Sequence, residues 1–150
     1  MRAPVLEETR TGLLHRTYVR FLNTLRTLLS RTSVQVGATA MTAQSATIST
    51  TAVATPELQN VLTRVSYSLR ITRAATTSSS ATLTLGWTTN SVSCTQAFAA
   101  VTGNTTGTQQ SDTMVIFPDV ATSVTYAVVY ASAGATTMQY ALDVRVEALP

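Results

Sequence analysis

The chain has 150 residues, of which 45% are hydrophobic but only 11% are charged, and its formal net charge is +3. A chain of this length suits one domain with an attached segment, and it can bury enough surface to fold without metals or disulfides. Because Cys94 is the sole cysteine, an intrachain disulfide and a cysteine-based metal cage are excluded. Threonine makes up about a fifth of the chain, and its branched Cβ favours strands.

The first predicted element is an amphipathic helix over about residues 9–30. Its large apolar residues recur in steps of four and three, which is the spacing of a coiled-coil seam. A helix of this length is marginal alone, so the stripe must pack against the rest of the chain or the same helix of another subunit. We therefore predict an assembly interface formed by Leu14, Tyr18, Phe21, Leu22, Leu25 and Leu28.

The positive charge is concentrated at this end of the chain. The first 31 residues hold six arginines and two glutamates, +6 − 2 = +4, and the rest holds four arginines and five acids, +4 − 5 = −1. Nucleic acid, an anionic membrane or an acidic protein surface could meet such a segment. However, Arg16, Arg20 and Arg26 are spread beside the apolar seam, so we expect neither a nucleic-acid nor a membrane partner. The sequence also predicts no secretory signal and no membrane span.

Alanine, threonine and serine dominate residues 32–60, where large apolar residues are rare. We expect an extended arm here with two short strands, around Val34 and Ile48, held in place by a neighbour or by the following domain. The predicted organisation is thus a helix over residues 1–31, an arm over 32–60 and a β-domain over 61–150.

Residues 61–150 show alternation of apolar and polar residues in several short segments, separated by turn residues. The strongest alternation runs from Val61 to Thr72, and no helical period intervenes. Short strands at such intervals indicate a sandwich or barrel. We predict an all-β fold, an antiparallel jelly-roll-like sandwich, with further strands at Leu83–Trp87, Val92–Phe98, Met114–Phe117, Val124–Tyr130 and Met138–Val146.

The phase of these strands predicts which side chains form the core. Trp87 follows two leucines in phase, which favours a core position over a platform for stacking sugars. Cys94 is in phase with Val92, which favours a small buried role. The predicted core comprises Val65, Tyr67, Leu69, Leu83, Leu85, Trp87, Phe117, Val128, Tyr140, Leu142 and Val144.

Catalytic chemistry finds little support in the sequence. His15 is the sole histidine and lies in the predicted helix, away from any acid or nucleophile. Asp112 and Asp119 occupy predicted turns, where aspartate bonds its own backbone. Asp143 and Glu147 share the polar face of one strand. The sequence therefore predicts a protein that is not an enzyme, with no catalytic residue, no cofactor and no metal site.

Two segments resemble parts of small tailed-phage virion structural proteins. Residues 16–25, RTYVRFLNTL, resemble the short aromatic-bearing helix that opens many of these proteins. Residues 124–130, VTYAVVY, with residues 138–149, MQYALDVRVEAL, resemble the closing hairpin of their β-domains. The resemblance covers about a quarter of the chain.

This resemblance implies a homotrimeric or otherwise symmetric virion component whose partners are copies of itself and the major capsid or another virion protein. The expected function is a self-assembling capsid decoration or cement subunit anchored through its N-terminal helix and arm. A tail or neck fibre or adaptor component remains an alternative. So does a carbohydrate- or receptor-binding β-module, which would use loops around Asn90, Asn104 and Gly134.

Overall fold

The computed structural model describes residues 17–24, 32–57 and 61–150. Residues 17–24 are helical. The β-domain, Val34–Leu149, forms a separate compact unit. It begins well before residue 61, because the segment expected to be an arm supplies two strands that pair along their length with strands near the C-terminus.

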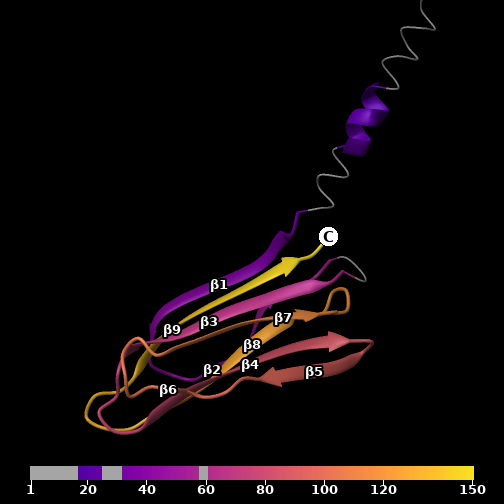
Figure 1. Cartoon of the computed structure of the whole chain (residues 1–150). Coiled ribbons are helices and arrows are strands. Elements are labelled where there is room, and N and C mark those ends of the chain that lie inside the picture. Colours follow the sequence, from indigo (N-terminus) through magenta and orange to yellow (C-terminus); the bar gives the residue numbers. More distant parts are fainter. Residues whose placement is uncertain (1–16, 25–31, 58–60) are drawn as a thin grey trace, which may run out of the picture. The chain divides into compact units, whose positions relative to one another are not determined.

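Two antiparallel sheets make up the β-domain (Figure 1). The first sheet has the strand order β1-β9-β3-β7, and the second has the order β2-β8-β4-β5, with the short β6 paired to β4. The strands are β1 Val34–Gln44, β2 Ile48–Ala54, β3 Thr63–Arg73, β4 Ser79–Thr89, β5 Val92–Ala97, β6 Val101–Thr102, β7 Gln109–Ile116, β8 Val124–Ser132 and β9 Gln139–Ala148.

The strand order is that of a jelly roll. If β6 is set aside, the first long strand pairs with the last, the second with the next to last, and so on inward to the β4–β5 hairpin. When such a long hairpin folds over on itself, successive long strands belong alternately to two facing sheets. The predicted all-β antiparallel sandwich is confirmed.

The core lies between the two sheets and follows from the period of two in each strand. Along β3, the side chains of Val65, Leu69 and Ile71 are fully buried, while Arg70 between them is exposed. Leu69 lies directly opposite Leu142 of β9 in the register of the first sheet. These strands therefore form the middle of the sandwich.

Nine of the eleven predicted core residues are buried, and two are not. Trp87 is half-buried at the margin of the core. Phe117 is 53% exposed, so its prediction was wrong. The side chains of Met114 and Ile116 on β7 point toward the core. Phe117 follows Ile116 directly, so its side chain points away from the core, where the strand ends before Pro118.

Tyr140 is a fully buried member of this core. Its hydroxyl donates a hydrogen bond of 2.7 Å to the carbonyl oxygen of Ala46, in the turn between β1 and β2. Burial, with smaller effects of Tyr130 and Tyr126, raises the pKa of Tyr140 to about 12. The neutral phenol is thus the form that the fold accommodates.

Stability is consequently expected to fall at alkaline pH. The unfolded chain ionises Tyr140 above about pH 10, whereas the folded chain resists ionisation until about pH 12. Between these values the unfolded state binds fewer protons, and up to about 2–3 kcal/mol of stability is lost. Urea unfolding at pH 9 and pH 11.5 measures this loss.

The matched variant is Tyr140→Phe, which removes the ionising group and should flatten the pH dependence. Tyr67, whose pKa is also raised by burial and then by Asp112, should leave a residual slope of the same sign. Equal stability of the native protein at both pH values would contradict the prediction.

Candidate assembly surfaces

The helix of residues 17–24 presents large apolar side chains that nothing in the described chain covers. Tyr18 and Phe21 are each 60% exposed, Leu22 is 41% exposed and Val19 is 39% exposed. Positions 18, 21 and 22 share one helix face, because residues three and four apart are neighbours. Of the predicted interface, Leu14, Leu25 and Leu28 lie outside the described residues. The described part of the stripe is an apolar face available to another surface.

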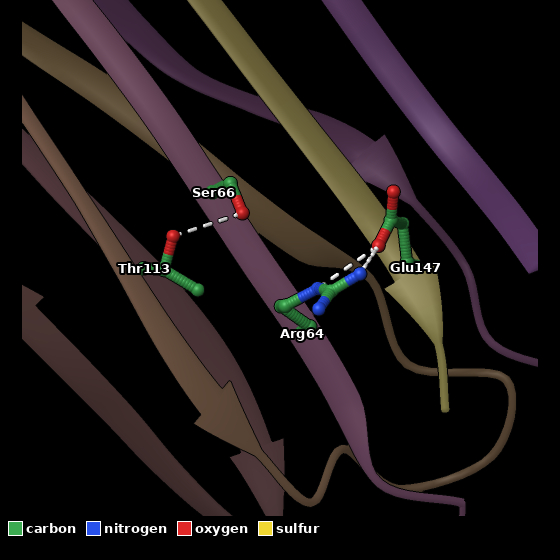
Figure 2. A network of polar contacts seen from close by, with 4 residues as sticks. All are labelled: Arg64, Ser66, Thr113 and Glu147. Carbon is green, nitrogen blue, oxygen red and sulfur yellow. Dashed lines mark hydrogen bonds and ion pairs between the residues drawn. The ribbon is translucent and has the colours of Figure 1, made fainter. Parts of the chain in front are cut away.

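The two sheets differ sharply in charge on their outer faces. The first sheet carries alternating charges along β9, where Asp143, Arg145 and Glu147 point outward between buried residues. Figure 2 shows Glu147 on β9 paired with Arg64 on the neighbouring β3, whose Nε donates to the carboxylate at 2.9 Å. Both side chains are partly exposed, so the pair contributes about 0–1 kcal/mol.

The same outer face also carries a row of small hydroxyl side chains. Ser66 of β3 and Thr113 of β7 are register partners, and their hydroxyl oxygens lie 3.1 Å apart (Figure 2). Asp143 and Glu147 are therefore surface carboxylates of a solvated sheet, as the sequence predicts, and they do not converge on a cleft.

The second sheet has no Asp, Glu, Lys or Arg in any of its strands. Its outward positions are threonine, serine, alanine and glycine, with Val129 of β8 62% exposed opposite Thr82 of β4. Burying charge is far costlier than burying apolar groups or small hydroxyls that find hydrogen bonds. This sheet is the part of the β-domain that can be covered at least cost.

A hollow of about 640 Å³ lies at the tip of the β4–β5 hairpin. Asn90 and Ser91 form the turn with positive φ angles of 50° and 62°. Their backbone N–H groups donate to the two carboxylate oxygens of Asp119, at 2.8 and 2.7 Å. Asp119 therefore holds the turn in this conformation, which is a structural role in keeping with its predicted turn position. The exposed ring of Phe117 also lines the hollow.

The loops proposed for a carbohydrate site do not come together. Asn90 follows the end of β4. Asn104 lies at the other end of this strand, where its side chain accepts a hydrogen bond of 3.2 Å from the backbone N–H of Ser79, the first residue of β4. Gly134 lies close to Thr77, also near the beginning of β4. The strand separates the two groups by its full length.

Cys94 is half-buried, not buried as predicted. It lies in β5, the edge strand of the second sheet, where five of six residues are exposed. Its thiol contacts the carbonyl oxygen of Val92 at 3.6 Å. An edge strand has a neighbour on one side only, which the local alternation of the sequence does not reveal.

No family model matches the chain, and no curated protein matches it in sequence. Among solved structures, it is similar to chains of infectious bursal disease virus, strain Gx (TM-score 0.46, 14% identity) and strain Gt (TM-score 0.41, 17% identity). Each similarity covers 77% of this chain and 32% of the viral chain, so this chain spans about a third of their length.

A third solved structure comes from Bacillus endospore appendages, described as a novel family of disulfide-linked pili. Its TM-score is 0.35 at 12% identity, over 81% of this chain and 94% of that chain. All three identities are low, and none of these similarities indicates a function for this chain.

Clusters of side chains that could bind a metal ion are lacking in the described parts of the chain. There, no three His, Cys, Asp or Glu residues gather closely enough to hold a metal ion. Asp112 lies on β7, not in a turn as predicted, and Asp119 lies in the following loop. The carboxylate of each accepts a hydrogen bond from a backbone N–H. His15 lies outside the described residues. No described helix is long and apolar enough to cross a membrane.

Proposed function

We propose that this chain is a non-enzymatic virion structural protein that assembles with copies of itself, as a trimeric capsid decoration or cement subunit anchored through its N-terminal helix. The observation that carries the proposal is the exposed apolar face of the helix, with Tyr18 and Phe21 each 60% exposed. The jelly-roll domain supports it by offering broad sheet surfaces and, in its described residues, no cluster of side chains that could hold a metal ion.

A single helix gains little stability from propensity alone, so the helix of residues 17–24 needs tertiary or quaternary packing. Each large apolar side chain removed from water contributes about 1.5–3 kcal/mol. Packing Tyr18, Phe21 and Leu22 against the same face of sister helices supplies this burial to every copy at once, because a symmetric assembly presents identical surfaces.

Replacing Tyr18 and Phe21 together by aspartate should therefore abolish assembly while leaving the β-domain folded. Two carboxylates on the seam would have to be desolvated unpaired, which is costlier than the burial gained. The mass from light scattering should fall about threefold as the helix seam separates. The circular dichroism of the β-domain and its unfolding midpoint should remain unchanged.

The matched control is Asn23→Asp with Thr24→Asp, which adds the same two charges on the opposite side of the helix. This variant should keep the native mass. If the native protein is itself a monomer by light scattering, or if the seam variant keeps the native mass, the helix does not drive assembly.

A carbohydrate- or receptor-binding module is the less favoured function. Its three candidate loops lie at opposite ends of β4, and Asp119 already uses both carboxylate oxygens on backbone amides. A tail or neck fibre would use the same helix seam, so the light-scattering experiment applies to it equally. Labelling of intact particles with an antibody against the β-domain would separate head from tail.

A further inference from the structure

The four long edge strands of the sandwich, β1, β2, β5 and β7, are not equally protected against pairing with another chain. The pairings of β1 with β9 and of β2 with β8 each contain two register shifts, which twist those edges. β7 is regular but carries Asp112 in mid-strand. β5 has no register shift, no proline and no charge. Natural edges are usually blunted by one of these devices, and β5 lacks all of them.

The hydrogen-bonding pattern identifies which groups of β5 face outward. Directly after the strand, the backbone N–H of Phe98 donates to the carbonyl oxygen of Leu83 at 3.0 Å. In an antiparallel pair, residues alternate between bonding the neighbouring strand and facing away from it. Val92, Cys94 and Gln96 therefore bond β4, and the N–H and C=O groups of Ser93, Thr95 and Ala97 lie along the free edge, where Figure 1 shows no further strand.

We propose that β5 pairs antiparallel with β5 of a second copy of this chain, about a two-fold axis at Thr95. This inference rests on the proposed self-assembly and names one of its contacts. A two-fold axis perpendicular to the sheet keeps each side chain on its own face, so residues of equal parity must lie opposite one another. Centring on Thr95 places Ser93 opposite Ala97 of the partner subunit and makes the outward groups meet. This gives about six hydrogen bonds once the Gln96 side chain, which donates to the Ala97 carbonyl oxygen at 2.8 Å, moves aside.

Charge favours β5 over the other regular edge. The second sheet has no charged residue in its strands, so joining two such sheets brings no like charges together. Pairing β7 with itself would bring two Asp112 carboxylates close to one another, which is unfavourable. A two-fold contact at β5 also complements a helix seam, because it links one helix-bound assembly to the next.

The test variant is Thr95→Pro in the full-length protein. Proline removes one outward N–H that makes no bond to β4, and its ring is tolerated where that N–H faces solvent. Thr95→Ala, which keeps the N–H, is the matched control. We expect Thr95→Pro to reduce the mass of the native assembly about twofold while Thr95→Ala retains it.

Hydrogen exchange on the native protein provides a readout that needs no variant. In the assembled protein, the amides of Ser93, Thr95 and Ala97 should exchange at least about tenfold more slowly than expected for an exposed edge. Suppose that these amides exchange at the exposed-edge rate and that the Tyr18 and Phe21 double variant still dissociates the assembly. This pair of results would overturn the β5 contact and leave the proposed function standing. A native protein that is monomeric would overturn both.

Discussion

Leu69→Ala and Leu142→Ala should each lower the free energy of unfolding by about 2–5 kcal/mol. Both side chains are fully buried and lie opposite one another on β3 and β9, in the middle of the first sheet. Each truncation leaves a cavity that the surrounding strands cannot fill. Because the two residues are neighbours, the double variant should depart from the sum of the single effects. Urea unfolding measures all three values.

Val129→Ala is the matched control, since it also removes apolar atoms from a strand. Val129 is 62% exposed on the outer face of β8, so its truncation should change stability by less than about 0.5 kcal/mol. Unchanged stability of both leucine variants would mean that the inward phase of β3 and β9 has been assigned to the wrong face.

Gly37→Val should destabilise the β-domain by about 3 kcal/mol, chiefly by detaching β1. A Cβ at this position would overlap the carbonyl oxygen of Val53 and lie 2.7 Å from the Cβ of Ala54. The obstacle is backbone, which cannot rotate away as a flexible side chain can. Gly37 is therefore required where β1 of one sheet passes close to β2 of the other.

The neighbouring Ala38→Val provides the control for this substitution. Ala38 is exposed on the outer side of the same strand, where a valine meets solvent and suits a strand. The control should leave the unfolding midpoint nearly unchanged. A Gly37→Val protein as stable as the Ala38→Val protein would show that β1 and β2 can move apart freely.

Most strands from Thr63 onward could be predicted because their large apolar residues alternate and their turns contain glycine, proline or asparagine. The short β6 was not predicted, and β7 was predicted only from Met114, because the first five residues of that strand are polar. β1 and β2 were not recognised as members of the sandwich, because their inward positions hold small or partly buried residues such as Gly37, Met41 and Val53. They are held by pairing with β9 and β8, which lie about 70 or more residues away in the sequence.

The candidate surfaces were predictable to different degrees. The spacing of Tyr18, Phe21 and Leu22 predicts the apolar helix face, and these residues are exposed in the structure. The uncharged sheet and its free edge at β5 could not be foreseen, because they depend on the order in which distant strands pair. The exposure of Phe117 and Cys94 was missed for the same reason. Phe117 follows the edge strand β7, and Cys94 lies in the edge strand β5.

The pairing of β1 with β9 gives the β-domain a direction-dependent resistance to mechanical load. Eight residue pairs join these strands, beginning with Val34 opposite Ala148. Their hydrogen bonds run perpendicular to the strands, so a pull on the preceding chain along β1 loads them all together in shear. A pull that separates Val34 from Ala148 breaks the pairs one after another from that end. In a subunit tethered through its N-terminal segment, the force needed to separate β1 from β9 is therefore far larger when it acts along β1 than when it acts across the strand.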